Sequence, residues 1–158
     1  MKRTLAVAAA ALLVGCAGTP AAQEPVMIDF STLEVPSSPN TWVIAPEGYL
    51  ATAKADVIAP VFDQAPSEVF AALVKIVEET PRRSAIDADT EALHLGYVAR
   101  VAFTLFLDDV DIAVLETEDG GSTLVAYSRS RVGYSDFGVN ERRLTKLMGK
   151  LTTALAAS

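Results

Sequence analysis

Residues 107–132, LDDVDIAVLETEDGGSTLVAYSRSRV, decide the fold. Apolar residues alternate with acidic or small ones through positions 109–114, and the alternation resumes over positions 123–132. Asp119-Gly120-Gly121 separates the two runs. A period of two is typical of a strand that buries one face, and Asp-Gly is a frequent hairpin turn. The stretch therefore predicts an antiparallel β-hairpin.

The charges in this stretch indicate how its two strands pair. If the numbers of paired residues sum to 240, Asp109 faces Arg131 and Asp111 faces Arg129. A sum of 241 instead places Ile112 opposite Arg129 and mixes the two faces. Because opposite charges across two strands contribute roughly 0.2 to 1 kcal/mol, we expect the even register with its acidic–basic pairs.

The residues before the hairpin predict loops, one helix and further strands. Prolines interrupt residues 27–62, so short extended pieces are expected there. Pro66-Ser67-Glu68 suits a helix start, and apolar residues then recur at three- and four-residue spacing up to Pro81. Residues 84–88 and 93–107 have strand patterns, with a break or bulge expected in the longer run. Alternation in that run places on one face Leu93, Leu95, Tyr97, Val101, Phe103 and Leu105, and on the other face His94, Arg100 and Thr104.

The residues after the hairpin predict a long closing helix. Asn140 is a favourable N-cap, Glu141 follows in the first turn, and large apolar residues recur from Leu144 to Leu155 with helical spacing. The order of elements favours a two-layer α+β domain, in which an antiparallel sheet is packed by a helix from the N-terminal half and by the long C-terminal helix. No repeat or second linker is visible, so residues 27–158 are expected to form a single domain.

The first sixteen residues have the order of a secretory leader. Lys2 and Arg3 precede ten apolar residues at positions 5–14, and Gly15 and Cys16 follow at once. Ten helical residues cover only about 15 Å, against a hydrocarbon core of roughly 30 Å, so a membrane-spanning helix is the poorer interpretation.

Leu13-Val14-Gly15-Cys16 resembles the lipobox of bacterial lipoproteins. The resemblance implies that residues 1–15 are removed as a signal peptide, that the Cys16 thiol is diacylated, and that the new amino terminus takes a third chain. Two or three acyl chains give lasting attachment where one does not. Ala17, rather than an aspartate, favours the outer membrane by the same resemblance, and residues 16–26 then form the acylated cysteine and a flexible tether. The alternative is an ordinary secretory leader with an incidental cysteine.

The charge of the chain limits its partners. Thirteen Lys and Arg stand against 20 Asp and Glu in 158 residues, for a formal net charge of -7. Removing residues 1–15 takes two of the basic residues away and makes the mature chain more acidic still. A nucleic-acid partner is therefore not expected, and one Cys with one His cannot build a four-ligand structural zinc site.

Four pieces of the sequence resemble the DUF1499 family of uncharacterised bacterial and plastid proteins. They are Ser38-Pro39-Asn40, Asp108-Asp109-Val110, the run SRSRVGYSDFGVN at residues 128–140, and Arg143. The resemblance covers roughly residues 35–155 and implies no established activity. Family members commonly read Cys-Pro-x-x-Pro-Asn-Cys where this chain has VPSSPNT at residues 35–41. The joint absence of both cysteines implies that they bridge each other where present, and argues against an essential thiol.

The same pieces hold the candidate site. One hypothesis is an anion or head-group pocket built from strand arginines, backbone amides of the loop at residues 133–138 and the N-terminus of the last helix. The other is a structural network in which the aspartates neutralise the arginines. The residues in question are Asp108, Asp109, Arg129, Arg131, Asp136, Asn140, Arg142 and Arg143.

Other candidate chemistry is weaker. Asp108, Asp109 and Asp111 lack the spacing of a calcium loop, and strand alternation sends Asp108 to the opposite face from the other two. His94 has no nucleophile placed beside it by any motif, so a surface histidine is the expected role. We therefore expect no metal, no cofactor and no catalytic residue.

Trp42 and Tyr49 follow the Pro39-Asn40 turn and could line a carbohydrate or lipid cleft, although a core or rim position is the commoner role.

The first functional hypothesis is a lipid-anchored, periplasm-facing envelope domain that contacts a protein, lipid or cell-wall partner without catalysis. The alternative is a small-molecule or lipid-binding module with a pocket between the sheet and the C-terminal helix. An enzyme ranks third, because no nucleophile, metal-ligand or phosphate-loop spacing is present.

Overall fold

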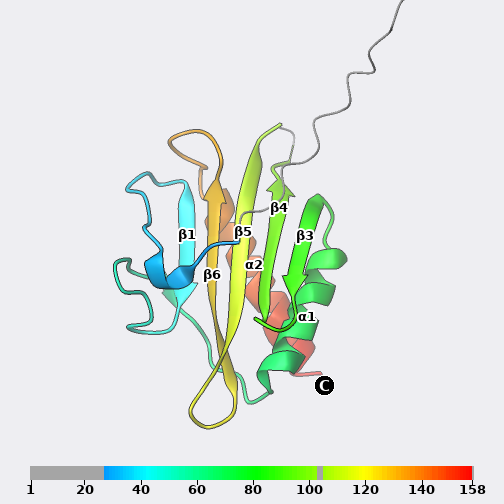
Figure 1. Cartoon of the computed structure of the whole chain (residues 1–158). Helices are drawn as coiled ribbons and strands as arrows, with labels where there is room; N and C mark the ends of the chain where they lie inside the picture. Colours follow the sequence, from blue (N-terminus) through cyan, green and yellow to red (C-terminus); the bar gives the residue numbers. More distant parts are fainter. Residues whose placement is uncertain (1–26, 103–104, 158) are drawn as a thin grey trace, which may run out of the picture.

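The computed structural model describes residues 27–102 and 105–157 (Figure 1). The expected leader, the lipidation site at Cys16 and the tether lie outside the described residues, as do Phe103 and Thr104 of the predicted strand at residues 93–107. Within the described part of the chain, no helix is long and apolar enough to cross a membrane.

One six-stranded sheet forms the centre of the domain. Strands β3 to β6 follow one another as an antiparallel meander, β1 pairs antiparallel with β6, and the short β2 adds a parallel edge. The sheet order is β2-β1-β6-β5-β4-β3. The strands are β1 Thr41–Ala45, β2 Val57–Ile58, β3 Arg83–Asp89, β4 His94–Arg100, β5 Leu107–Glu116 and β6 Ser122–Ser130.

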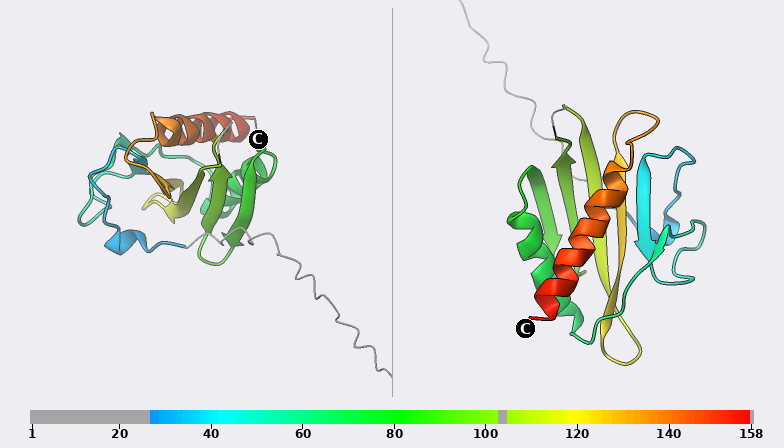
Figure 2. Two further views of the ribbon diagram at one scale, coloured as in Figure 1. Left: turned by 90° about the horizontal axis from the view of Figure 1, so that it is seen from above. Right: turned by 180° about the vertical axis from the view of Figure 1, so that it is seen from behind.

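Two helices, α1 Pro66–Glu78 and α2 Val139–Leu155, pack on one face of this sheet (Figure 2). Their buried side chains share one core with the inward-facing residues of β1, β4, β5 and β6. The predicted α+β class with a mid-chain helix and a long C-terminal helix is therefore confirmed. A smaller core on the other face is covered by the N-terminal segment with its 3-10 helix η1 Phe30–Thr32. This segment contributes Phe30 and Leu33 to the smaller core.

The start of α2 differs from the prediction. Gly138, with a φ of 73°, is the N-cap, and Asn140 is the second helical residue and fully buried. The capping carboxylate belongs to Asp136, which accepts hydrogen bonds from the backbone N–H of Gly138 at 2.9 Å and of Asn140 at 2.6 Å. The left-handed glycine starts the helix earlier than expected, and it frees the Asn140 side chain for other partners.

The hairpin of β5 and β6 has the predicted even parity but a different register. Asp109 lies opposite Arg129, and Asp111 lies opposite Tyr127, so the pairs sum to 238 instead of 240. The expected facing pairs Asp109–Arg131 and Asp111–Arg129 were therefore wrong, although Asp109 and Arg131 still form an ion pair. The turn spans residues 117–121 and uses Gly120 at a φ of 81°, which centres the hairpin one residue earlier than the Asp-Gly-Gly sequence suggests.

The predicted strand at residues 93–107 is in fact the end of one strand and the start of another. β4 ends at Arg100, which pairs with Leu107 at the start of β5, and the N–H of Val101 donates to the carbonyl of Phe106 at 3.0 Å. The prediction placed Leu105 on the same face as Leu95 and Tyr97. Those two residues are buried, whereas Leu105 is 85% exposed. Apolar residues continue through this turn without Gly or Pro, so the sequence pattern hid it.

Candidate functional site

The quoted pieces of sequence that hold the candidate site meet around a buried ion pair on the helix side of the sheet. Arg143 of α2 forms an ion pair with Asp108 of β5 through Nη2 and Oδ2. The two side chains are 6% and 0% exposed. Arg143 Nη1 also donates to Ser128 Oγ at 2.9 Å and to Asn140 Oδ1. The positive charge near the start of α2, which opposes the helix dipole, is therefore neutralised inside the protein.

Asn140 ties three parts of the chain together. Its amide nitrogen donates to the Asn40 carbonyl at 2.9 Å, to Ser130 Oγ at 3.1 Å and to Asp136 Oδ2 at 2.7 Å. Its amide oxygen accepts from Ser128 Oγ at 2.6 Å. A fully buried amide with all these partners fixes the ends of β1 and β6 against α2.

The arginines at the end of β6, Arg129 and Arg131, lie on the opposite sheet face, whereas Arg142 is exposed on α2. Arg131 donates to Asp109 Oδ1 through Nε at 2.9 Å and Nη2 at 2.6 Å, and Arg129 Nε lies 3.7 Å from Asp109 Oδ2. The strand arginines and Arg143 therefore do not surround one cavity. Asp136 also occupies the backbone amides at the start of α2 that an external anion would need. The geometry is that of a structural network.

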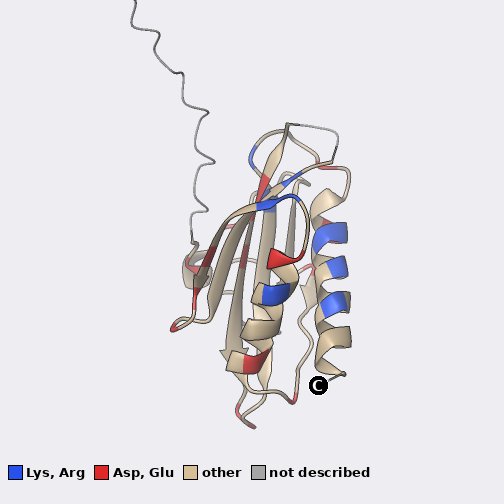
Figure 3. Cartoon of the chain, turned by 90° about the vertical axis from the view of Figure 1, so that its right-hand side faces the viewer, with Lys and Arg blue, Asp and Glu red and all other residues tan. Residues whose placement is uncertain are grey.

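A cavity that the sequence analysis missed lies between the end of α1, strands β3 and β4, and α2. Its volume is about 210 Å³. We call it the basic pocket. Its lining comprises the cations Arg82, Arg83, Arg100, Arg143, Lys146 and Lys150 together with Val77, Thr80, Pro81, Tyr97 and Leu147. No acidic side chain is among the described residues of this lining, and Figure 3 shows the Lys and Arg positions of α2 in blue.

Of the pocket cations without a described carboxylate partner, Arg83 is the least exposed. Its guanidinium carbon lies 5.3 Å from the centroid of the Tyr97 ring, and its Nε is buried without a hydrogen-bond partner among the described residues. Burial lowers the pKa of Arg83, the charges of Arg143 and Arg82 lower it further, and Tyr97 acts in the opposite direction. Burial also raises the pKa of Tyr97, so its hydroxyl stays protonated at neutral pH.

Most of the positive charge at the pocket is not neutralised by the protein. The ion pairs of the described residues include Arg143 but none of the other five cations of the lining. Lys150 donates to Thr80 Oγ1 at 3.2 Å, beside the negative end of the α1 dipole, which accounts for part of the charge. The chain as a whole has a net charge of -7, so five such cations around one cavity stand out from the rest of the protein. A cavity of this kind is suited to an anion.

The comparison with known protein families agrees with the quoted motifs. The family described as protein of unknown function (DUF1499) matches residues 31–151. The chain belongs to the DUF1499 family. No curated protein matches it.

The remaining candidate residues of the DUF1499 domain are not part of the basic pocket. His94 was expected on the surface, but it is half-buried. Its Nε2 lies 3.5 Å from Asp111 Oδ1, and its ring centroid lies 5.5 Å from that of Phe30. The N-terminal segment covers it, which sequence proximity could not reveal. Among the described residues no group of three or more His, Cys, Asp and Glu could hold a metal ion.

Trp42 and Tyr49 of the DUF1499 domain are not brought together in one cavity. Trp42 lines a pocket of about 440 Å³ beside the loop that precedes α2, and Tyr49, 40% exposed, is not part of that lining. The pocket mixes Lys54 with Asp56, Asp136 and Glu141, so it has no uniform charge.

The residues of the basic pocket were missed because they are far apart in the sequence. Arg82 and Arg83 follow α1, Arg100 ends β4, and the lysines come from α2. One local pattern did exist, since Lys146 and Lys150 are four residues apart and so share a helix face. Without the position of β3 and β4, that face could not be distinguished from a solvated one.

Proposed function

We propose that this protein is a cell-envelope lipoprotein whose DUF1499 domain is a non-enzymatic module that binds a phosphate-like anionic group in the basic pocket. The proposal depends on five cations that surround one cavity of about 210 Å³ and that have no carboxylate partner among residues 27–102 and 105–157. Of the two functional hypotheses drawn from the sequence, this geometry favours the module with a pocket between sheet and C-terminal helix.

The size and walls of the pocket define the ligand class. Drug-sized ligands occupy roughly 300 to 1,000 Å³, so this cavity suits one anionic group with a small organic part. Arg83 and Arg100 supply guanidinium donors that match phosphate oxygens, and Lys146 supplies a point charge. The Tyr97 ring and Leu147 provide an apolar wall for a carbon portion of the ligand. A phosphate monoester fits these requirements.

Calorimetry and thermal unfolding of the purified full-length protein test the pocket. We expect inorganic phosphate and glycerol 3-phosphate to bind and to raise Tm, whereas chloride at equal ionic strength does not. Phosphate monoesters gain their second negative charge near pH 6, so binding should strengthen as the pH rises from 5 to 7.5. Vesicles with and without an anionic phospholipid, measured beside the free phosphates, distinguish a lipid head group from a soluble ligand.

Two variants with a matched control locate the binding site. Arg83→Met keeps the aliphatic part of the side chain and removes the charged guanidinium, and Lys146→Gln removes a second charge at an exposed position. Both should lose most of the phosphate response. Lys75→Gln on α1 lies outside the pocket lining and should keep it. If all three variants respond as the wild type does, the pocket is not the site, and the interaction or structural domain remains the better hypothesis.

The lipid anchor is a separate part of the proposal. The lipobox-like run ending at Cys16 supports acylation and, with Ala17, placement in the outer membrane. Mass spectrometry of the mature protein should find Cys16 at the amino terminus with the mass of two or three acyl chains. Cys16→Ser should leave unprocessed precursor. A mature chain that begins at another residue, or that carries no acyl mass, contradicts the anchor without affecting the pocket.

A further inference from the structure

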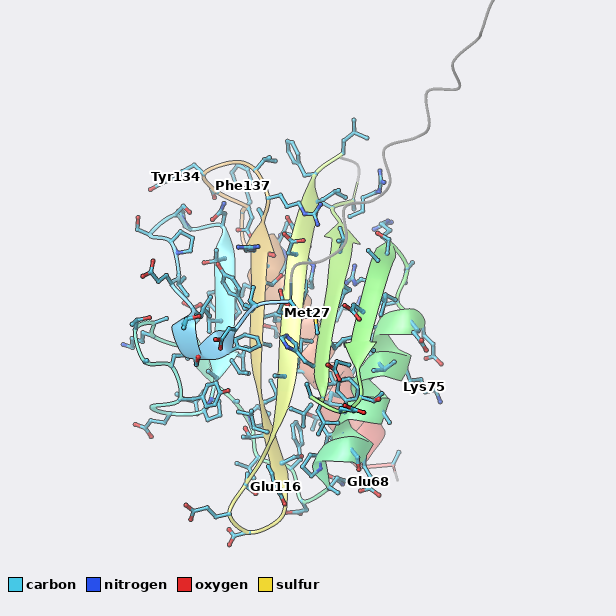
Figure 4. All side chains as sticks on the ribbon, viewed as in Figure 1. Met27, Glu68, Lys75, Glu116, Tyr134 and Phe137 are labelled. Carbon is cyan, nitrogen blue, oxygen red and sulfur yellow. The ribbon has the colours of Figure 1, made fainter. Side chains whose placement is uncertain are left out.

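Two loops at one end of the domain expose five large apolar side chains. One loop joins β4 to β5 and the other joins β6 to α2, and Figure 4 labels Tyr134 and Phe137 in the second loop. The exposed fractions are 85% for Leu105, 57% for Phe106, 56% for Val132, 75% for Tyr134 and 87% for Phe137. We call these five residues the apolar crown. Such a concentration of exposed large side chains marks an interaction surface.

The two loops of the crown are held beside each other by the sheet. The Arg131 N–H donates to the Leu107 carbonyl at 3.1 Å, which joins the end of β6 to the start of β5. Phe137 has a φ of 53°, a left-handed conformation that is unfavourable for a phenylalanine. Its carbonyl accepts from Arg142 Nη1 at 2.9 Å, and its N–H donates to Ser135 Oγ at 3.3 Å. The loop therefore keeps an aromatic side chain in solvent by means of defined hydrogen bonds.

The two ends of the molecule differ in charge as well as in apolar surface. Exposed Arg100 and Arg142 flank the crown, with Glu141 beside them. At the opposite end, where Figure 4 labels Glu116, the turn between β5 and β6 exposes Glu118 and Asp119. An anionic bilayer would repel the second end, whereas at the first end Glu141 and the half-buried Asp136 balance Arg100 and Arg142.

We propose that the apolar crown docks into the interfacial layer of the bilayer to which the protein is anchored. The inference rests on the proposed lipid anchor. Met27, the first described residue, is eleven residues after Cys16, and a chain of that length spans at most about 36 to 40 Å. The Ile28 N–H donates to Asp111 Oδ1 at 3.3 Å, and Asp111 lies four residues, about 13 Å, from the crown end of β5. The reach is sufficient for the crown to touch the membrane.

Docking in this way sets the orientation of the domain. Tyrosine and phenylalanine side chains are favoured at the head-group level of a bilayer, and the acyl chains already provide attachment. Arg100 ends β4 directly before the crown loop and also lines the basic pocket. The docked orientation therefore brings one wall of the basic pocket close to the head groups, where phosphate-bearing ligands are present.

Tryptophan fluorescence of the full-length lipidated protein in vesicles tests the orientation. Phe137→Trp places a reporter in the crown, and Val61→Trp places one at a site that is 70% exposed, next to Phe62, which pairs with Ser122 at the opposite end of the sheet. Trp42 is common to both variants, so its emission is subtracted with the wild type. With lipids brominated along the acyl chain, Phe137→Trp should shift to shorter wavelength and lose several-fold more fluorescence than Val61→Trp. Aqueous iodide should give the reverse order.

Each other outcome decides against the crown proposal. Equal quenching of both variants by iodide, with none by brominated lipid, means that the crown faces solvent. Protection of Phe137→Trp from both quenchers means that a second copy or another protein covers it. Acyl mass and phosphate binding are measured on the same samples, so a failed anchor or pocket is recognised separately. If no acyl chain is found, the variants are added to preformed brominated vesicles, and an unshifted Phe137→Trp emission overturns the proposal.

Discussion

The two basic regions of this molecule differ in what neutralises them. Arg143, Arg131 and Arg129 each have an aspartate of β5 within ion-pair distance, and the Arg143–Asp108 pair is almost completely buried. Arg83 and Lys146 of the basic pocket have no carboxylate partner among the described residues. The comparison teaches that charge balance in space, and not the density of arginines along the chain, separates a structural network from a binding site.

The strongest test of the comparison is the buried ion pair. Asp108→Asn preserves shape but leaves the Arg143 guanidinium unpaired in the interior. We expect it to lower the free energy of unfolding by about 3 to 5 kcal/mol. Urea denaturation measures this change. Arg142, the exposed residue next to Arg143, provides the control. Arg142→Ala should lower the free energy of unfolding by no more than about 1 kcal/mol. Equal losses in both variants would show that the pair is not structural.

The next effect concerns the buried amide. Asn140→Ala removes the acceptor of the Ser128 hydroxyl and one of the donors to the Asn40 carbonyl, and we expect a loss of about 2 kcal/mol. Asp136→Ala removes the capping carboxylate from a partly exposed position and should cost about 1 kcal/mol. Denaturant unfolding of both variants gives the order. If Asp136→Ala proves the more costly, the cap and not the interior network governs the loop before α2.

The ion pair on the other face should be weaker. Asp109 and Arg131 lie at a half-buried site, so a double-mutant cycle of Asp109→Ala and Arg131→Ala should give a coupling of about 1 kcal/mol or less. Arg129 lies farther from the same carboxylate and should couple less. Additive effects at Asp109 and Arg131, measured by thermal and denaturant unfolding, would show that solvent screens the pair completely.

Arg83→Met in the basic pocket should have the smallest effect on stability, and this contrast with the buried ion pair distinguishes the two basic regions. Arg83→Met removes a cation that is close to other cations, so the free energy of unfolding without phosphate should change by no more than about 0.5 kcal/mol, or rise slightly. The same variant should lose the increase in Tm that phosphate gives to the wild type. Thermal unfolding with and without phosphate measures both values. A large loss of stability without phosphate would instead make Arg83 part of the structural network.

The sequence by itself determined the local features of this protein. The alternation at residues 108–111 placed Asp108 on one face and Asp109 and Asp111 on the other, because side chains in a strand alternate with a period of two. Helical spacing and Pro66 located α1, and leucine spacing located α2. The motifs of residues 128–143 were sufficient to predict the family. Each of these features depends on neighbours a few residues away.

Only the tertiary structure decided the register, the role of Asn140 and the basic pocket. The five-residue turn at 117–121 moved the hairpin pairing by two residues, and the partners of Asn140 include Asn40, one hundred residues away. Arg83, Arg100 and Lys146 become neighbours only because β3, β4 and α2 pack together. Whether a charged side chain is neutralised depends on distances in space, and these distances are set by the packing of elements that are far apart along the chain.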